Sequence, residues 1–314
     1  MGQTKKAGIR TISRAKALRN ELVITEIKGA LSSLFHYTNI ESFANIVASK
    51  CIWLSRIDRM NDGTEVFKEA SRTYAFCMTA VPTESVGMWI AYGVPRRDAI
   101  RVRFSGKAIH EIFTAHHGRV EVHPVKSGLA DTARTIQGEI SLQYVGYVSR
   151  NGDRVHVRNK IFKFAEDLKS SREEVMNSYG SFIKWLGWAY EHEIRLVVQL
   201  DKEIDADKIQ LDISGVVEKA LTYKSKKRNA TQGMPSVVVG PWSNCEDFIR
   251  KFSSKIEDRA DREDVGYFLE HAADDAPLVR ESEFAGKIHL GRCTNCNKKD
   301  ACDCGYCEVK GCML

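Results

Sequence analysis

The chain has 314 residues, of which 43% are hydrophobic and 28% are charged, and its formal net charge is +6. This composition is typical of a folded globular protein and excludes a disordered or fibrous one. No apolar run approaches the roughly 20 residues that a transmembrane helix requires, and the basic N-terminal stretch lacks the apolar core of a secretory signal. We therefore expect a soluble, cytoplasmic protein without a membrane partner.

A basic N-terminal extension ends near residue 29, where the predicted strands and helices begin. Residues 1–28 form a basic extension, which we interpret as a solvated arm or a loosely held helix. Residues 34–37 then predict a short strand, and Asn39 is a suitable N-cap for the helix that follows. Apolar side chains at helical spacing support that helix: Ile40, Phe43, Ile46 and Val47.

The rest of the chain up to residue 255 alternates between clustered strands and short helices. The expected strands are 51–55, 74–81, 99–106, 120–125, 142–149, 208–212 and 235–239, and a further one is entered within residues 182–200. The expected helices are 107–115, 157–169 and one beginning after residue 243, and residues 85–93 predict a short helix or a turn. Because the strands arrive in clusters and not in strict alternation with helices, the pattern favours an α+β fold over a doubly wound parallel sheet.

Two glutamates flank a histidine in "GWAYEHEIRLVVQL", residues 187–200. If this stretch is extended, Glu191 and Glu193 project to the same side and His192 points away. Paired carboxylates indicate a site where one of them meets a cation or a sugar hydroxyl. The alternative is a polar strand entrance with Arg195 as an ion-pair partner, and the pair alone favours that alternative.

Two further motifs are candidates for ligand contacts. "FHYTN" places His36, Tyr37 and Thr38 where a strand leads into a helix, and backbone amides and hydroxyls there suit an anionic or ribosyl ligand. "MWIAY" places Trp89 and Tyr92 three residues apart, on one face of a helix. Core packing is the commoner fate of such aromatics, and a platform for a planar ring is the functional alternative.

The order of five motifs resembles a known family. "FHYTNIESFANIVASKCIWLS", "RMNDGTE", "MWIAYG", "WAYEHEIRLV" and "VVVGPW" follow one another over residues 34–254. Together they look like a bacterial family of largely uncharacterised domains similar to the ADP-ribosyltransferase fold. The resemblance implies a mixed or antiparallel split-sheet core with flanking helices over residues 29–255.

The resemblance also implies site residues. Glu193 would be the catalytic carboxylate, and Glu191 would orient the acceptor. The residues implied to bind NAD are His36, Tyr37, Thr38, Ser55, Trp89 and Tyr92. Ser55, Tyr74, Trp89 and Tyr92 compete for the central position of the family pattern, and Asn61, Asp62 and Glu65 shape either the pocket or only a turn. We expect His36, Thr38 and Glu193 to share one cleft.

The implied function is that of an NAD-dependent ADP-ribosyltransferase, a glycosyltransferase with NAD as a substrate. The resemblance points to an intracellular bacterial toxin or anti-phage effector, with an antitoxin or regulatory protein as a further partner. Basic residues at the N-terminus and in "YKSKKRNATQG" favour RNA or another nucleic acid over protein as the acceptor. The alternatives are a non-catalytic module that binds nucleic acid or protein, and an NAD glycohydrolase.

A cysteine-rich tail follows an acidic linker or helical segment at residues 256–288. Within residues 289–314, Cys293, Cys296, Cys304 and Cys307 form two Cys-x-x-Cys pairs, which predict a structural zinc site. Cys302 and Cys312 bring the thiols to six, so an iron–sulfur cluster or a two-metal site is an alternative. The alternative to metal binding is a flexible, redox-active tail.

Overall fold

The structure is a computed structural model, and its described residues fall into two compact units. It describes residues 9–12, 15–60, 65, 67–93, 98–115, 118–126, 129–130, 134–149, 154–158, 160–164, 179–215, 237–257 and 279–285. The first unit draws on residues 1–36, 45–82 and 103–224, and the second on 37–44, 83–102 and 225–314. In the described segments, no helix is long and apolar enough to cross a membrane.

The elements of the described chain confirm a mixed α+β architecture. The strands are β1 (Ile9–Ile12), β2 (Ser33–Asn39), β3 (Cys51–Arg56), β4 (Thr73–Thr79), β5 (Ala99–Ser105), β6 (Arg119–Lys126), β7 (Leu129–Ala130), β8 (Ile136–Tyr144), β9 (Gly146–Val148), β10 (Arg154–Val157), β11 (Lys160–Phe164), β12 (Ile183–Trp185), β13 (Glu193–Leu200), β14 (Lys208–Asp212), β15 (Val237–Val239) and β16 (Val279–Glu281). The α-helices are α1 (Ala15–Leu22), α2 (Ile40–Ser49), α3 (Val86–Gly93), α4 (Gly106–Ala115) and α7 (Cys245–Glu257). The 3-10 segments are η1 (Gly29–Ser32), η2 (Ile57–Arg59), η3 (Ala70–Arg72), η5 (Gly180–Phe182) and η6 (Leu186–Glu191).

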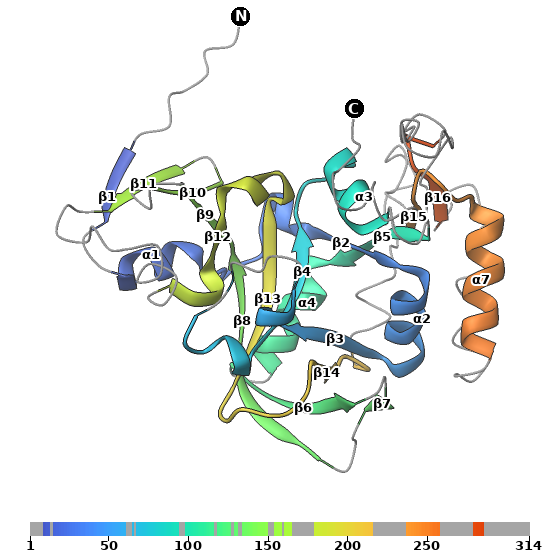
Figure 1. Cartoon of the computed structure of the whole chain (residues 1–314), viewed down its shortest axis with the longest axis horizontal. Helices are drawn as coiled ribbons and strands as arrows, with labels where there is room; N and C mark the ends of the chain where they lie inside the picture. Colours follow the sequence, from blue (N-terminus) through green and yellow to red (C-terminus); the bar gives the residue numbers. More distant parts are fainter. Residues whose placement is uncertain are drawn as a thin grey trace, which may run out of the picture. The chain divides into compact units, whose positions relative to one another are not determined.

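Antiparallel strands of the first unit close into a barrel (Figure 1). Around the barrel the order is β13, β8, β6, β14, β3 and β4, and β4 pairs with β13 again to close the ring. The pairing register aligns one apolar face on all of these strands. That face supplies the buried interior, which includes Leu54, Tyr74, Phe76, Met78, Val122, Ile140, Leu142, Ile194, Leu196, Val198, Ile209 and Leu211.

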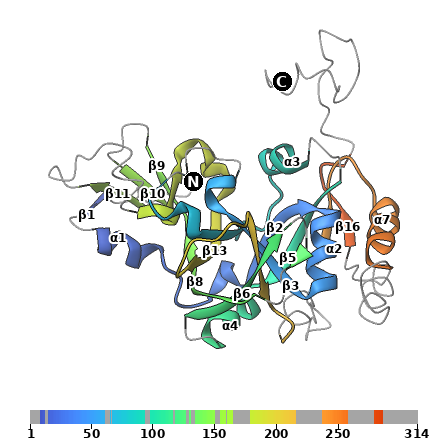
Figure 2. The ribbon, with the colours of Figure 1, turned by 60° about the horizontal axis from the view of Figure 1, so that its bottom comes forward.

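A second, smaller sheet of the first unit has the strand order β1, β11, β10, β9 and β12. One face of it packs with α1, which Figure 2 shows beside β10 and β11. The buried core between them consists of Leu18, Leu22, Val148, Val155, Val157, Phe162, Tyr179 and Ile183. Burial of this face leaves the opposite face of β9 and β12 for polar side chains, because neighbouring residues of a strand point to opposite faces.

This smaller sheet corrects two sequence-based expectations. Residues 9–12 and 15–22 are a paired strand and a helix with buried leucines, so part of the 1–28 extension belongs to the folded unit. The helix expected at 157–169 is wrong over its described residues, where β10 and β11 form an antiparallel hairpin. Val155 and Val157 alternate with polar residues at the two-residue period of a strand, and this pattern prevails over helix propensity.

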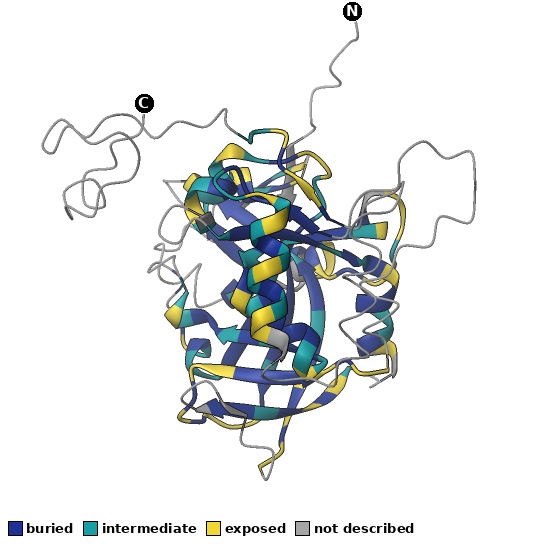
Figure 3. Ribbon diagram, turned by 90° about the vertical axis from the view of Figure 1, so that its right-hand side faces the viewer, coloured by how far each residue is buried: buried dark blue, intermediate teal, exposed yellow. Residues whose placement is uncertain are grey.

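The second unit combines short strands with α3 and α7. β15 pairs antiparallel with β5 and parallel with β16. Phe248 and Phe252 lie on the buried side of α7, the helix that faces the viewer in Figure 3, and Phe252 stacks on Phe43 with 5.2 Å between the ring centroids. This helix alternates between buried and exposed residues, as expected for an amphipathic helix at the surface of a unit.

Most other expected elements are confirmed. The amide of Ser42 donates to Oδ1 of Asn39 over 2.8 Å, so Asn39 caps α2 as predicted. Asn244 caps α7 in the same way, since its Oδ1 accepts from the amide of Asp247 over 2.8 Å. The strands expected in the first half of the chain correspond to β2 to β6, and the helices expected there correspond to α2, α3 and α4.

Candidate functional site

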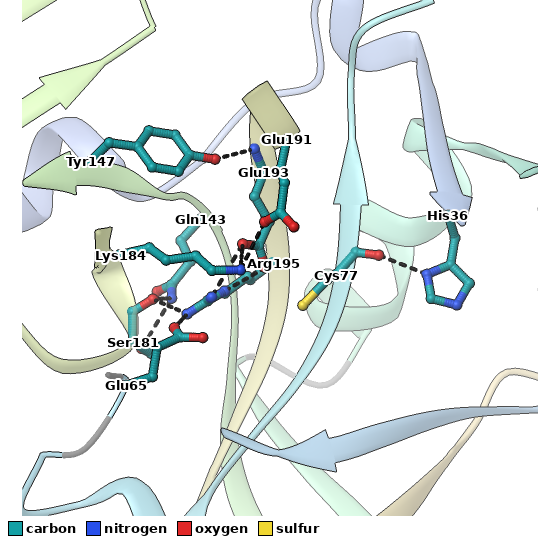
Figure 4. Close-up of polar contacts among 10 residues, drawn as sticks. All are labelled: His36, Glu65, Cys77, Gln143, Tyr147, Ser181, Lys184, Glu191, Glu193 and Arg195. Carbon is teal, nitrogen blue, oxygen red and sulfur yellow. Dashed lines mark hydrogen bonds and ion pairs between the residues drawn. The ribbon is translucent and has the colours of Figure 1, made fainter. Parts of the chain in front are cut away.

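The first unit contains a buried cluster of charged side chains on the outer wall of the barrel (Figure 4). Lys184 Nζ lies 2.8 Å from Glu191 Oε2 and 3.3 Å from Glu193 Oε2. The guanidinium of Arg195 holds Glu193 through Nε, 2.7 Å from Oε1, and through Nη2, 3.2 Å from Oε2. Glu65 Oε1 lies 2.5 Å from Arg195 Nη1. All five side chains are at most 3% exposed.

Strand alternation explains why these residues meet. Glu193 and Arg195 are two residues apart on β13, and both point away from the apolar barrel interior. Arg195 pairs with Cys77 of β4 on one side and with Gln143 of β8 on the other, so these side chains share the outer face. Lys184 lies beside Tyr147 in the register of β12 and β9, on the face of the smaller sheet opposite its apolar core.

A tight turn, and not the extended strand expected from the sequence, places Glu191 beside Glu193. Glu191 ends η6 and does not belong to β13. His192 follows with φ 44° and ψ 49°, a left-handed conformation that is uncommon outside glycine and that redirects the chain into the strand. Both carboxylates nevertheless reach Lys184. The expected proximity of the two glutamates is therefore present, although the stretch is not extended throughout.

The two carboxylates of the pair have widely separated proton affinities. Burial raises the pKa of Glu193, but Arg195 and Lys184 lower it more, so that the net pKa is about 2. Burial, together with the charge of Glu193, raises the pKa of Glu191 to about 7 against the opposing effect of Lys184. Burial also raises the pKa of the Glu65 carboxyl. At neutral pH the Glu193 carboxyl is therefore ionised, while the Glu191 carboxyl is about half protonated.

The cluster contains more acids than bases. Three carboxyl groups face two cationic side chains, so one negative charge is uncompensated when all five groups are ionised. Among the described residues, Oε1 of Glu191 and Oε2 of Glu65 have no hydrogen-bond partner. A buried unpaired charge is costly, and a proton on Glu191 or Glu65 removes it.

A pocket with a volume of about 290 Å³ opens beside this cluster, at the start of β13. Its lining includes Glu193 and His192 of the turn into β13, the two tyrosines Tyr144 and Tyr147, and Arg158. The hydroxyl of Tyr147 accepts a hydrogen bond from the amide of Glu193 over 2.7 Å. Apolar residues complete the wall: Leu31, Ala80, Val81, Pro82, Val145 and Ile194.

Two lining residues of the pocket have unusual backbone conformations. Arg158 has φ 52° and His192 has φ 44°, and Lys50 is the third non-glycine residue with positive φ in the described chain. Such conformations cost free energy and cluster at functional sites. The Arg158 guanidinium lies 4.9 Å from the ring centroid of Tyr144 and is exposed at the pocket.

His36 lies on the other side of β4 from the charge cluster, as Figure 4 shows. Its Nδ1 is 2.7 Å from the carbonyl oxygen of Cys77, and its ring lies 4.1 Å from that of Phe76, which points into the barrel. Burial lowers the pKa of His36 to about 4, so the ring is neutral at pH 7. The expectation of one cleft shared by His36 and Glu193 is therefore not met, because alternation along β2 and β4 sends the two side chains to opposite faces.

The other residues implied to bind NAD are distributed differently. Tyr37, Trp89 and Tyr92 belong to an aromatic cluster of the second unit, with 4.9 Å between the ring centroids of Tyr37 and Trp89. Trp89 is fully buried and donates through Nε1 to Glu84 over 3.1 Å. It is therefore a core residue and not an exposed platform for a planar ring. Thr38 also belongs to the second unit. Ser55 pairs with Ala75 on the outer face of the barrel.

Sequence reasoning identified part of the cluster and missed the rest. Arg195 was expected as an ion partner, and it pairs with Glu193 as that alternative proposed. Glu65, which the sequence predicts to shape either the pocket or only a turn, contacts Arg195 through its carboxylate. Lys184, Tyr147 and Arg158 were missed. A lysine between apolar residues in "FIKWLG" was the available signal for Lys184, since a buried lysine requires an acidic partner.

Several expected residues lie outside the described part of the chain. These are Asn61, Asp62, Cys293, Cys296, Cys302, Cys304, Cys307 and Cys312. Within the described segments, no group of three or more histidine, cysteine or acidic side chains is arranged to hold a metal ion. The zinc site therefore stays a prediction from the cysteine spacing.

Comparison with protein-family models, with curated proteins and with solved structures finds no match to this chain.

Proposed function

We propose that the chain is an NAD-dependent ADP-ribosyltransferase whose reacting centre is the pocket beside Glu193. The observation that carries the proposal is the pair of carboxylates, Glu193 and Glu191, joined through Lys184 and holding pKa values of about 2 and about 7. Two carboxyl groups with separated proton affinities are what glycosyl chemistry requires, because one must stay ionised while the other exchanges a proton.

The reaction exchanges one glycosidic bond for another. The bond between C1′ of the ribose and the nicotinamide nitrogen breaks, and the electron pair leaves with neutral nicotinamide. Positive charge develops on the ribose, where the fixed negative charge of Glu193 stabilises it. The acceptor atom then forms the new bond to C1′ and releases a proton, for which Glu191 is a suitable base at neutral pH.

Other lining residues fit the parts of NAD. Tyr144 and Tyr147 offer aromatic surface for a planar ring. The volume of about 290 Å³ matches one part of the dinucleotide, so the remainder would extend from the pocket. The proposal rests on this pocket and does not require NAD contacts from His36.

Glu193→Gln is the direct test, read out as nicotinamide release and as label transferred from adenylate-labelled NAD to a cell lysate. We expect turnover to fall by a factor of about one hundred or more in the folded variant, as for other electrostatic stabilisers. Glu139→Gln makes the same change at an exposed position of β8 and should leave turnover unchanged. Full turnover by folded Glu193→Gln would overturn the proposal.

A second variant separates loss of chemistry from loss of stability. Ala80 lines the pocket and is half-buried, so Ala80→Trp fills the pocket without changing any charge in the cluster. We expect it to abolish NAD turnover while circular dichroism stays that of the unmodified chain. Nicotinamide release without transferred label, in every lysate fraction, would assign the pocket to NAD hydrolysis instead of transfer.

A further inference from the structure

The turn that precedes Glu191 carries two aromatic side chains at the surface of the first unit. The ring centroids of Trp188 and Tyr190 are 6.2 Å apart, and Tyr190 is 41% exposed. The other exposed large hydrophobic residues of the described chain are Val23, at 36%, and Val86, at 39%. Lys184 Nζ lies 4.6 Å from the ring centroid of Trp188, which positions that ring directly next to the buried charge cluster.

Basic side chains lie on β10, which pairs with β9 in the smaller sheet. His156 pairs with Tyr147, and Tyr147 pairs with Lys184, so these three side chains share the face opposite the apolar core. Arg154 is two residues from His156 on β10 and projects to that face as well. Arg158 follows the strand, lines the pocket and has no carboxylate partner among the described residues.

Across the sheet the order is therefore His156 of β10, then Tyr147 of the pocket wall, then Lys184, whose Nζ lies beside Trp188 of η6. A polymer with regularly spaced negative charges and planar rings is complementary to this order. Guanidinium groups attract phosphates, and an exposed aromatic ring stacks on an unpaired base whatever its sequence. A duplex fits poorly, because its bases are already stacked on one another and are not available to Tyr190.

We infer that the surface formed by Trp188, Tyr190, Arg154, His156 and Arg158 binds single-stranded nucleic acid. This inference rests on the proposed function in one respect: the bound strand would be the acceptor of the ADP-ribosyl group, presented next to the Glu193 pocket. Binding itself requires no NAD, so it can fail or succeed independently of the enzyme activity.

The experiment is fluorescence anisotropy of the full chain without NAD, with labelled 12-nucleotide RNA, DNA of the same sequence and the corresponding duplex, over a series of salt concentrations. We expect both single strands to bind more tightly than the duplex. Tyr190→Ala should weaken single-strand binding about five- to a hundredfold, the range for loss of one base stack. Tyr190→Phe keeps the ring and should bind like the unmodified chain.

A charge variant tests the basic part of the surface. Arg158→Gln should weaken binding and reduce the slope of log K against log salt by about 0.7, the value for one phosphate contact with a single strand. Arg134→Gln removes an exposed arginine between β6 and β8 and serves as the matched control.

Three results would overturn the inference. These are absence of single-strand binding at low salt, binding that is unchanged by both Tyr190→Ala and Arg158→Gln, and equal weakening by Arg134→Gln. If any of them occurs while NAD turnover depends on Glu193, the proposed function stands and the acceptor binds elsewhere. If the strand binds as expected and NAD is not consumed, the surface stands and the proposed function fails.

Discussion

Replacing Glu193 by glutamine tests the physical basis of the buried cluster. The substitution keeps the volume of the side chain and removes its negative charge, so Arg195 and Lys184 lose their shared partner. Removing one member of a buried ion pair typically costs about 3 to 5 kcal/mol. Here the lower end applies, because Arg195 keeps Glu65 and Lys184 keeps Glu191.

The pKa of Glu193 gives an independent magnitude. The pKa falls from the usual 4.5 to about 2. Since a tenfold change in an acid constant corresponds to about 1.4 kcal/mol, the folded state favours the ionised carboxylate by about 3 kcal/mol. This contribution is present above pH 4.5 and is lost as the pH falls towards 2. Both routes predict that Glu193→Gln lowers the free energy of unfolding at pH 7 by about 3 kcal/mol.

Urea unfolding at pH 7, followed by tryptophan fluorescence, measures this difference. Glu139→Gln is the matched control, and a change at an exposed position should stay within about 0.5 kcal/mol. If Glu193→Gln costs less than about 1 kcal/mol, or no more than the control, then the cluster does not hold Glu193 as an ionised, paired carboxylate. The same measurement shows at which temperatures the variant is folded for the NAD assay.

The remaining predictions concern other parts of the chain. The raised pKa of Glu191, about 7, means that its contribution to the free energy of unfolding is present below pH 4.5 and is lost as the pH rises to 7. Glu191→Gln should therefore reduce the difference in stability between pH 5 and pH 8, measured by urea unfolding. Asn39→Ala removes the cap of α2 and should cost about 1 kcal/mol by thermal unfolding, whereas Asn39→Asp should cost less. Gly106→Ala places a methyl group against the carbonyl oxygen of Leu31 and should lower the free energy of unfolding in urea by about 2 kcal/mol or more. Protein purified without chelator should contain zinc by elemental analysis and lose it on deletion of residues 289–314; equal zinc content in both would contradict the predicted site.

Local patterns determined the elements that sequence reasoning predicted correctly. The cap and apolar spacing of α2 involve residues within one or two helical turns, and the strand character of β13 is visible in "EIRLVVQL" itself. The helix expected from residue 157 is wrong because its local pattern is ambiguous. "KIFKF" has apolar residues at positions that suit either a strand or one face of a helix, and the pairing of β11 with both β1 and β10 decides between them.

Long-range pairing determined the parts that the sequence did not reveal. Lys184 is nine residues from Glu193, but the two meet because β12 pairs with β9 in the smaller sheet while η6 and its left-handed turn lead into β13 of the barrel. Spacing along the chain alone does not predict that arrangement. The faces of β2 and β4 likewise depend on register. A shift of one residue would send His36 to the side of Glu193, so the order of motifs along the chain could not establish that they share a cleft.

The composition of the cluster argues for a function beyond stability. Ion pairs in a protein interior are often no more stabilising than apolar side chains of similar volume, and an excess of one carboxyl adds a further cost. An apolar wall at this position would have met the needs of the barrel. The chain instead keeps Glu191 close to its point of half-ionisation, one lysine away from Glu193, a residue of the pocket wall. A site of this kind can accept a proton at neutral pH without losing the negative charge of Glu193. The proposed transfer needs both properties, because the charge stabilises the ribosyl cation while the acceptor gives up its proton.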